Sequence, residues 1–258
     1  MPKGSTQTRL ENIAKEGAQV DIQEMNYDDC VRLAAKEADE TERGVIVQDT
    51  AWDGYEEIPA WIMQGYGTMA MEAGEQLKAQ GCERPTHIFV QAGVGSLAGA
   101  VVGYFANLYA DNPPTFVVVE AEAAACLYKG AAAGDGDIRI VDGDMQTIMA
   151  GLACGEPNTI SWDILKNHVK VFIAAPDWVA ANGMRMLAAP IKGDASITSG
   201  ESGAAPFGAL AAMTTLDEYE QLKKDIGLDE NSRVLLFSTE GDTDPDRYKN
   251  IVWKGLDK

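Results

Sequence analysis

Short apolar runs alternate along the chain with longer segments in which apolar residues recur every three or four positions. The short runs predict buried strands at residues 19–23, 44–48, 87–91, 115–120, 170–174 and 233–237. The periodic segments predict helices at residues 5–16, 58–80, 97–109, 121–129, 177–187, 202–213 and 216–226, with others starting at Asn26 and lying near Met145 and Trp162. Apolar strands separated by helices are typical of a parallel sheet covered on both faces. We therefore expect an α/β fold with a doubly wound, mostly parallel sheet.

Residues near the predicted helix ends support these assignments. Ser5 and Asp177 are suitable N-caps, and Gly17 follows the first helix as a C-terminal glycine often does. Pro59 is tolerated in the first turn of its helix. The chain opens with a helix that no strand precedes, which is unusual for a doubly wound domain. This order suggests an N-terminally truncated chain.

Composition and charge narrow the classes of function. The 258 residues are 46% hydrophobic and 24% charged, which is ordinary for globular proteins. The net charge of -19 repels phosphate backbones and anionic membranes, so we expect no nucleic-acid or membrane partner. The first residues lack a secretory signal, and the four cysteines are widely spaced without a C-x-x-C motif. These features predict free thiols, a cytoplasmic protein and, with His87 and His168 as the only histidines, no metal site.

The strongest chemical signal is the glycine-rich run from Gln91 to Gly99, which lies between a predicted strand and a predicted helix. Its glycines let the backbone turn tightly and approach a ligand, and N–H groups at a helix N-terminus favour an anion. The predicted phosphate-binding residues are Gly93, Val94, Gly95, Ser96 and Leu97, with the Ser96 hydroxyl as a further donor. A tight turn that only packs helix on strand is the alternative.

A dinucleotide is another possible ligand of this loop. The run reads G-x-G-x-x-x-G, and Glu120 ends the next predicted strand, roughly where an acid that binds the ribose of NAD is expected. A nicotinamide-dependent oxidoreductase is therefore an alternative function. Two features count against it, because two predicted strands precede the loop and its third glycine is one position late.

Several motifs together resemble the diaminopropionate ammonia-lyase family. They span nearly the whole chain, at residues 47–55, 61–66, 91–99, 148–158, 199–204 and 238–244. The resemblance implies the pyridoxal-phosphate (PLP) fold of tryptophan synthase β, threonine deaminase and serine racemase. It also implies that the glycine loop holds the cofactor phosphate and that Ser238 faces the pyridine nitrogen, with Thr239 as a second candidate.

The resemblance further implies a carbon–nitrogen lyase of amino-acid catabolism. Such an enzyme eliminates ammonia from 2,3-diaminopropionate and yields pyruvate and two ammonia, and the family's habit is a homodimer. Residues 1–50 would be the remainder of a small N-terminal domain and residues 51–258 the large PLP-binding domain. The family carries its Schiff-base lysine in an N-terminal segment, and no lysine of this chain lies in that motif. We therefore expect an incomplete form, or a non-catalytic remnant that binds a phosphorylated ligand.

Three acidic residues are candidates for the reaction itself. Asp49 ends a predicted strand, and the resemblance favours a substrate-facing carboxylate whose pKa is raised by partial burial. An Asp-Thr pair at that point is otherwise a common helix N-cap. Glu156 and Glu201 are further candidates on the substrate side, although a simple turn and a favourable interaction with a helix dipole would also explain them.

Overall fold

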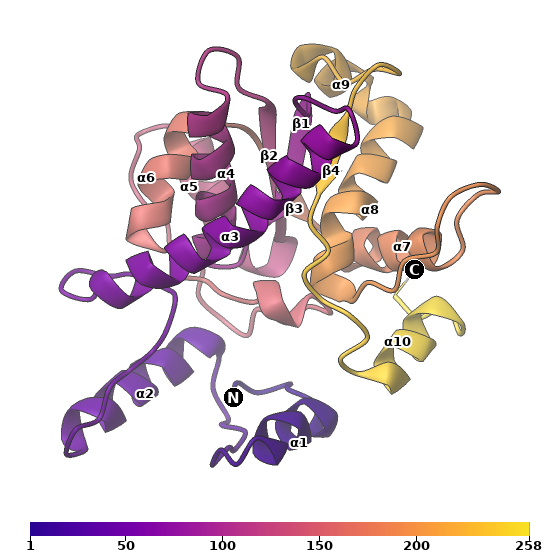
Figure 1. The fold of residues 1–258 in the computed structure, drawn as a ribbon. Coiled ribbons are helices and arrows are strands. Elements are labelled where there is room, and N and C mark those ends of the chain that lie inside the picture. Colours follow the sequence, from indigo (N-terminus) through magenta and orange to yellow (C-terminus); the bar gives the residue numbers. More distant parts are fainter. Residues whose placement is uncertain (258) are drawn as a thin grey trace.

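A four-stranded parallel sheet forms the centre of the protein (Figure 1), whose computed structural model describes residues 1–257. The strand order is β3-β2-β1-β4, and every neighbouring pair is parallel. The strands are β1 (His87–Gln91), β2 (Thr115–Ala121), β3 (Val169–Ala175) and β4 (Val234–Leu236). The expected α/β architecture with a parallel sheet is therefore confirmed.

Alternating side chains of the central strands build two separate cores. Ile88 and Val90 of β1 face one side of the sheet, whereas Phe89 faces the other, and all three are fully buried. Their side of the sheet is covered by α3 (Glu57–Ala79), α4 (Ser96–Leu108), α5 (Cys126–Ala133) and α6 (Thr159–His168). The side of Phe89 is covered by α7 (Asp177–Ala188), α8 (Glu201–Thr215), α9 (Glu220–Ile226) and α10 (Pro245–Val252). Burial on both faces explains why consecutive residues in the middle of β1 and β2 are apolar.

The chain order places two loops at the same edge of the sheet. The crossover from β1 through α4 to β2 joins two adjacent parallel strands, so the glycine loop lies at their carboxyl ends. Strand β4 pairs with the other side of β1. The segment after β4 consequently emerges beside the glycine loop.

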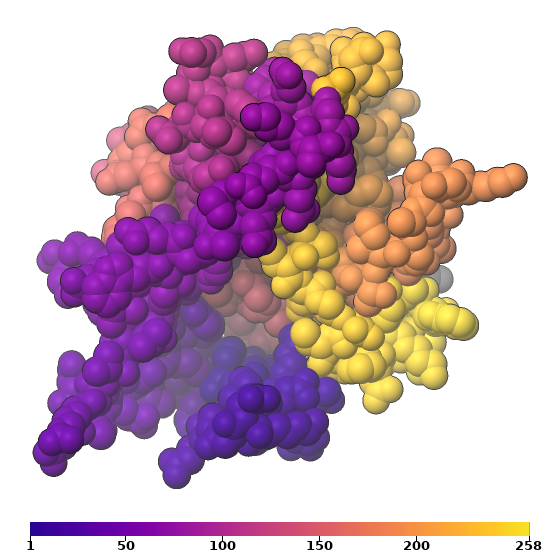
Figure 2. Space-filling view, in the orientation of Figure 1, coloured from indigo at the N-terminus to yellow at the C-terminus, as the bar shows by residue number. Residues whose placement is uncertain are grey.

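The first two helices lie outside these layers (Figures 1 and 2). Helix α1 (Gln7–Lys15) buries none of its residues, and α2 (Tyr27–Glu40) buries only Asp28. Arg9 joins α1 to Glu240 at 3.2 Å, and the Asn12 side chain donates to the Thr243 carbonyl at 3.4 Å. The N-terminal helix is thus attached to the segment that follows β4.

Two predicted strands are not present. Residues 19–23 and 44–48 have no strand partner among residues 1–257. Val45 and Val47 are 69% and 73% exposed, so their apolar character does not reflect burial in the sheet. The prediction failed because a strand needs a hydrogen-bonded neighbour, which a local pattern cannot supply.

Several helix ends also differ from the prediction. Thr6, not Ser5, caps α1 by accepting from the Arg9 N–H, and residues 121–129 divide into a 3₁₀ turn (Glu122–Ala124) and α5. Met145 is not helical, because its φ is 45°. Two further 3₁₀ turns are Ala150–Leu152 and Asp217–Tyr219.

Asp177 and α10 also differ from the prediction, the first because of a tertiary contact and the second because a local signal was missed. Asp177 is the first residue of α7 rather than its cap, and its carboxylate accepts from the Thr147 hydroxyl and the Ile148 N–H. The prediction missed α10, although Asp244 caps it and Pro245 opens it, a combination that favours helix starts. Within residues 1–257, no helix is both long and apolar enough to cross a bilayer.

Close packing of α7 on α8 gives a stability prediction. A Cβ on Gly183 of α7 would lie 2.5 Å from the Ala204 carbonyl oxygen on α8, whereas a Cβ on Gly65 of α3 would meet nothing within 4 Å. We expect Gly183→Ala to lower the free energy of unfolding by about 1–3 kcal/mol because the helices must separate. Gly65→Ala should raise it by up to about 1 kcal/mol through helix propensity. Urea denaturation of both variants measures this, and equal effects would contradict the packing argument.

Candidate functional site

A cavity of about 310 Å³ lies at the carboxyl edge of the sheet. Its walls include predicted site residues from three separate segments, namely Asp49, the loop from Gly93 to Leu97, and Thr239. The other lining residues are Tyr27, Tyr66, Gln91, Ala92, Ala150, Gly151, Leu152, Cys154, Ser202 and Glu240. Ser238, Glu156 and Glu201 are not on its walls.

The glycine loop presents free backbone donors to this cavity. Gly95 has a left-handed φ of 100° and immediately precedes α4, a conformation that favours glycine. Among residues 1–257, no N–H group from Gly93 to Leu97 donates to another backbone carbonyl. Unpaired N–H groups at the positive end of a helix dipole form an anion site. The loop can therefore hold a phosphate.

The same glycines also admit helix α6. A Cβ on Gly95 would lie 2.8 Å from the Ser161 hydroxyl oxygen, and one on Gly99 would lie 2.6 Å from the Ser161 Cβ. Packing against α6 therefore requires glycine at both positions. A phosphate-binding loop and a tight turn that packs helix on strand, the two interpretations of this run in the sequence, are compatible.

Asn158 connects the glycine loop to the Asp49 segment. Its side-chain nitrogen donates to the Asp49 carbonyl at 2.7 Å and to the Ser96 hydroxyl at 2.9 Å. Its oxygen accepts from the Ser161 N–H and so caps α6. The Ser96 hydroxyl donates to the Asp49 carbonyl at 2.7 Å, which corrects the expectation that this hydroxyl is directed at a phosphate. The sequence analysis missed Asn158, although an Asn before a helix is a recognisable cap.

Asp49 lies in a loop and not at a strand end, contrary to the prediction. The Tyr66 hydroxyl donates to its carboxylate at 3.4 Å. Burial raises the pKa of Asp49, and its hydrogen bonds oppose that effect only in part. Burial also raises the pKa of Tyr66. A carboxyl group whose pKa is raised towards neutrality is better suited to exchange protons with a ligand.

The two predicted hydroxyls after β4 have different surroundings. The Ser238 hydroxyl lies 2.8 Å from that of Ser199 and does not line the cavity. Thr239 does line it, and its hydroxyl oxygen accepts from the Gln91 side-chain nitrogen at 2.8 Å. The structure therefore brings Thr239, the second candidate, to the cavity wall.

Glu201 and Glu156 are paired with arginines away from the cavity. Glu201 is 4% exposed and lies 3.0 Å from Arg247, and burial raises the pKa of its carboxyl group. Glu156 pairs with Arg32 beside a separate hollow. Glu240 lines the main cavity instead and accepts from the Ser202 N–H at 2.7 Å. Glu240 lies within the motif of residues 238–244, and that motif could have identified it from the sequence.

Glu120 does not offer a free carboxylate to a ribose. It is 1% exposed and accepts from the N–H groups of Leu127 at 2.8 Å and Tyr128 at 2.7 Å. Burial raises the pKa of Glu120 to about 8. Because its oxygens already bind the start of α5, the dinucleotide alternative lacks the acidic residue it needs.

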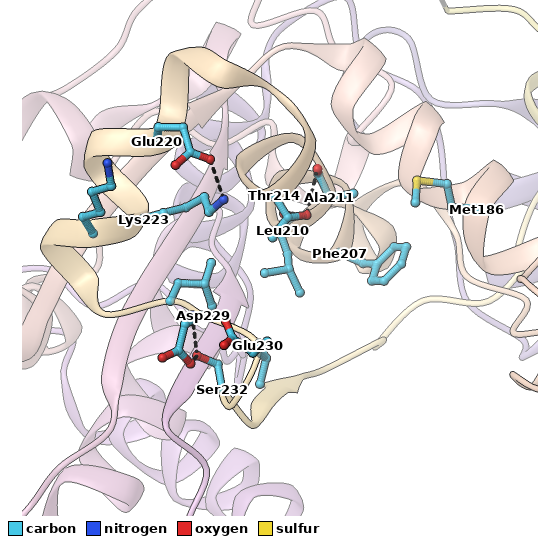
Figure 3. Close-up of a pocket in the computed structure, with 13 residues that line it drawn as sticks. Met186, Phe207, Leu210, Ala211, Thr214, Glu220, Lys223, Asp229, Glu230 and Ser232 are labelled. Carbon is cyan, nitrogen blue, oxygen red and sulfur yellow. Dashed lines mark hydrogen bonds and ion pairs between the residues drawn. The ribbon is translucent and has the colours of Figure 1, made fainter.

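Two further observations concern a second hollow and possible metal ligands, away from the glycine loop. A hollow of about 600 Å³ is lined by α8, α9 and β4 (Figure 3), and Lys223 and Glu220 form an ion pair of 2.7 Å at its side. None of the predicted site residues lines it. In the part of the chain that the structure describes, no three His, Cys, Asp or Glu side chains are grouped as a metal site requires.

The fold and the loop with free N–H groups define an α/β protein with a cavity suited to an anionic ligand. A family model described as pyridoxal-phosphate dependent enzyme matches residues 1–239, and the chain belongs to this family. The diaminopropionate ammonia-lyase of Salmonella typhimurium is 53% identical over 256 residues, which are 99% of this chain and 63% of that protein. The corresponding Escherichia coli protein is 48% identical over 255 residues.

Comparison with solved structures also finds similarity to a diaminopropionate ammonia lyase. The chain superposes on Escherichia coli diaminopropionate ammonia lyase in complex with an aminoacrylate–PLP azomethine intermediate with a TM-score of 0.93 and 46% identity, covering 100% of this chain and 64% of that one. Maize serine racemase, at 19% identity and a TM-score of 0.72, shares the fold. The chain spans 63% of the length of the curated relatives described above.

Burial of Glu120 gives a prediction about pH. A carboxyl group whose pKa rises from its ordinary value of 4.5 to about 8 on folding holds its proton more tightly in the native state. The free energy of unfolding should therefore fall as pH rises from about 4.5 to about 8. Glu120→Gln should flatten this dependence, whereas Glu122→Gln, at an exposed position, should not. Urea denaturation across this range measures it, and an unchanged slope in Glu120→Gln would contradict it.

Proposed function

We propose that the protein is a PLP-dependent lyase that eliminates ammonia from 2,3-diaminopropionate. The observation that carries the proposal is the 53% identity to a diaminopropionate ammonia-lyase along 99% of the chain, with the anion-binding loop on a cavity of suitable size. The overall change consumes one water and yields pyruvate and two ammonia. The protein would therefore act in amino-acid catabolism.

The residues on the cavity fit two parts of the cofactor. Backbone N–H groups from Gly93 to Leu97 would hold the phosphate, and the Thr239 hydroxyl is available for the pyridine nitrogen. Among residues 1–257, no lysine lines the cavity, so the described residues supply no partner for the aldehyde. When bound, PLP supplies an electron sink for the carbon from which the proton is removed.

Asp49 is the residue that we assign to proton transfer. Its carboxyl group lies on the same cavity as the phosphate loop, and burial raises its pKa. It would exchange the α-proton of one enantiomer or bind its amino group. Asn158 fixes the Asp49 main chain and so holds this carboxyl group at a set distance from the phosphate site.

Glu156 and Glu201 fit this reaction less well as substrate-side residues. Neither lines the cavity; pairing with arginine does not separate them from Glu240, which itself pairs with Arg9 at 3.2 Å. Glu240 takes the place of Glu201 in our proposal, since it lines the cavity beside Ser202. A carboxylate there could receive the second amino group of a diamine.

The proposal also includes the domain organisation, the location and the oligomeric state of the protein. We assign residues 1–50 to a small N-terminal domain and residues 51–258 to the large cofactor-binding domain, because α1 and α2 lie outside the layers of the sheet. We also propose a cytoplasmic homodimer. The four cysteines are free, as is usual in a reducing compartment, and the family resemblance supports the dimer.

Titrations with PLP and with NADH distinguish a PLP-dependent lyase from a nicotinamide-dependent oxidoreductase. We expect purified protein to bind PLP, seen as a change in visible absorbance, and to release pyruvate from one enantiomer of 2,3-diaminopropionate in a coupled assay. Binding of NADH without PLP binding would instead favour an oxidoreductase. PLP binding without pyruvate release would favour a non-catalytic, phosphate-binding protein.

The composition of the cavity wall predicts how PLP is held. Since no lysine among residues 1–257 lines the cavity, we expect PLP bound by these 258 residues to be removed by gel filtration after borohydride treatment. Mass spectrometry should then detect the unmodified chain. A stable reduced adduct on one of its lysines would show that the described cavity is not where the aldehyde lies.

Asp49→Asn tests the proton-transfer role. The amide keeps the size of the side chain but cannot exchange the proton, so kcat for pyruvate release should fall about 100-fold or more. PLP affinity should stay within about twofold, because the phosphate loop is untouched. The control is Asp53→Asn, at an exposed turn four residues later, which should retain activity. Equal activity of the two variants would remove Asp49 from the mechanism.

A further inference from the structure

We infer that Gln91 is a positioning residue that fixes the Thr239 hydroxyl as a hydrogen-bond donor to the pyridine nitrogen of PLP. The inference rests on the proposed cofactor. It adds a residue that precedes the phosphate loop and reaches across to the segment after β4. The Gln91 side chain would thereby connect the loop that holds the phosphate with the residue that contacts the pyridine nitrogen.

The orientation of the Gln91 amide follows from one contact. Gln91 is the last residue of β1, and its side-chain nitrogen donates to the Phe237 carbonyl at 3.0 Å. A backbone carbonyl can only accept a hydrogen bond, so the nitrogen, and not the oxygen, must face Phe237. The second hydrogen of the same nitrogen is donated to the Thr239 hydroxyl oxygen at 2.8 Å.

This contact decides what Thr239 can offer to a ligand. The amide nitrogen accepts no hydrogen bond, so the Thr239 oxygen must be the acceptor in this pair. Its own hydrogen then remains for another partner, and Thr239 lines the cavity. A neutral hydroxyl donates a hydrogen bond without transferring its proton, so a pyridine nitrogen in this position stays unprotonated.

Two further observations favour Gln91 and Thr239 over Ser238. The Ser238 hydroxyl is engaged with Ser199 at 2.8 Å, and Ser238 does not line the cavity. Gln91 is 3% exposed, and its side-chain oxygen has no hydrogen-bond partner among residues 1–257. A buried unpaired acceptor is destabilising. We therefore attribute the glutamine at this position to the two hydrogen bonds that its nitrogen donates, and not to any stabilisation by its oxygen.

Gln91→Glu is the sharpest test, because it keeps the size of the side chain while a carboxyl group replaces the amide donors. If the new carboxyl group is protonated, its single O–H is required by the Phe237 carbonyl. Whether neutral or ionised, it then presents an oxygen to Thr239. The Thr239 hydroxyl would donate to that oxygen and be lost to the ring nitrogen.

The readouts are the ¹⁵N chemical shift of bound PLP labelled at the pyridine nitrogen, followed across neutral pH, and the Kd for PLP. We expect the wild-type ring nitrogen to remain unprotonated throughout. In Gln91→Glu it should titrate, and Kd should rise about tenfold for the loss of one hydrogen bond. Thr239→Val should show the same loss of affinity, and Thr239→Ser should restore the wild-type shift. Circular dichroism confirms that each variant is folded.

Ser238→Ala is the matched control and should leave shift and affinity unchanged. The inference is overturned if Gln91→Glu and Thr239→Val match the wild type, or if Ser238→Ala alone changes the shift. It is also overturned if Gln91→Glu is unfolded while folded Thr239→Val keeps the wild-type shift. Failure of the wild-type protein to bind PLP would instead refute the proposed function from which the inference starts.

Discussion

The hydrogen bonds of Asn158 hold the site together. One amide group donates to the Asp49 carbonyl and the Ser96 hydroxyl and accepts from the Ser161 N–H. It thereby joins the Asp49 loop, the start of α4 and the start of α6. Asn158 is fully buried, and removing one partner of such a network leaves the others unpaired at a cost of about 1–3 kcal/mol each. Together with the Ser96 hydroxyl, which donates to the same Asp49 carbonyl, this side chain sets the position of the Asp49 loop relative to the glycine loop.

A second set of contacts brings the N-terminal helix to the same cavity. Arg9 of α1 lies between Glu240, at 3.2 Å, and Glu201, at 3.6 Å. All three side chains are largely buried, so these charges require one another, and loss of one partner would leave an uncompensated charge. Glu201 does not line the cavity, and these partners give it a structural role. Its negative charge holds α1 and α10 against the start of α8, because Arg247 belongs to α10.

Much of the candidate site could be predicted because some of its chemistry is local. The glycine loop was visible because a phosphate site made of main-chain N–H groups needs only glycines between a strand and a helix. Asp49 and Thr239 entered through motifs that resemble a known family. Asn158 and Glu240 were missed as site residues, since an asparagine cap and a loop glutamate are common in any sequence. Ser96 was given the wrong role because its partner, the Asp49 carbonyl, is 47 positions away in the chain.

The sequence by itself determined the buried strands, the helices between them, and the glycine loop that joins β1 to α4. These features depend on residue type and spacing over short distances, where side-chain alternation and helix periodicity act directly. Only the tertiary structure decided that residues 44–48 form no strand, that Thr239 rather than Ser238 reaches the cavity, and that Glu120 is engaged by α5. Each of these outcomes depends on a hydrogen-bond partner distant in sequence or on the packing of a neighbouring segment, and a local pattern contains no information about which partner a polar group will find.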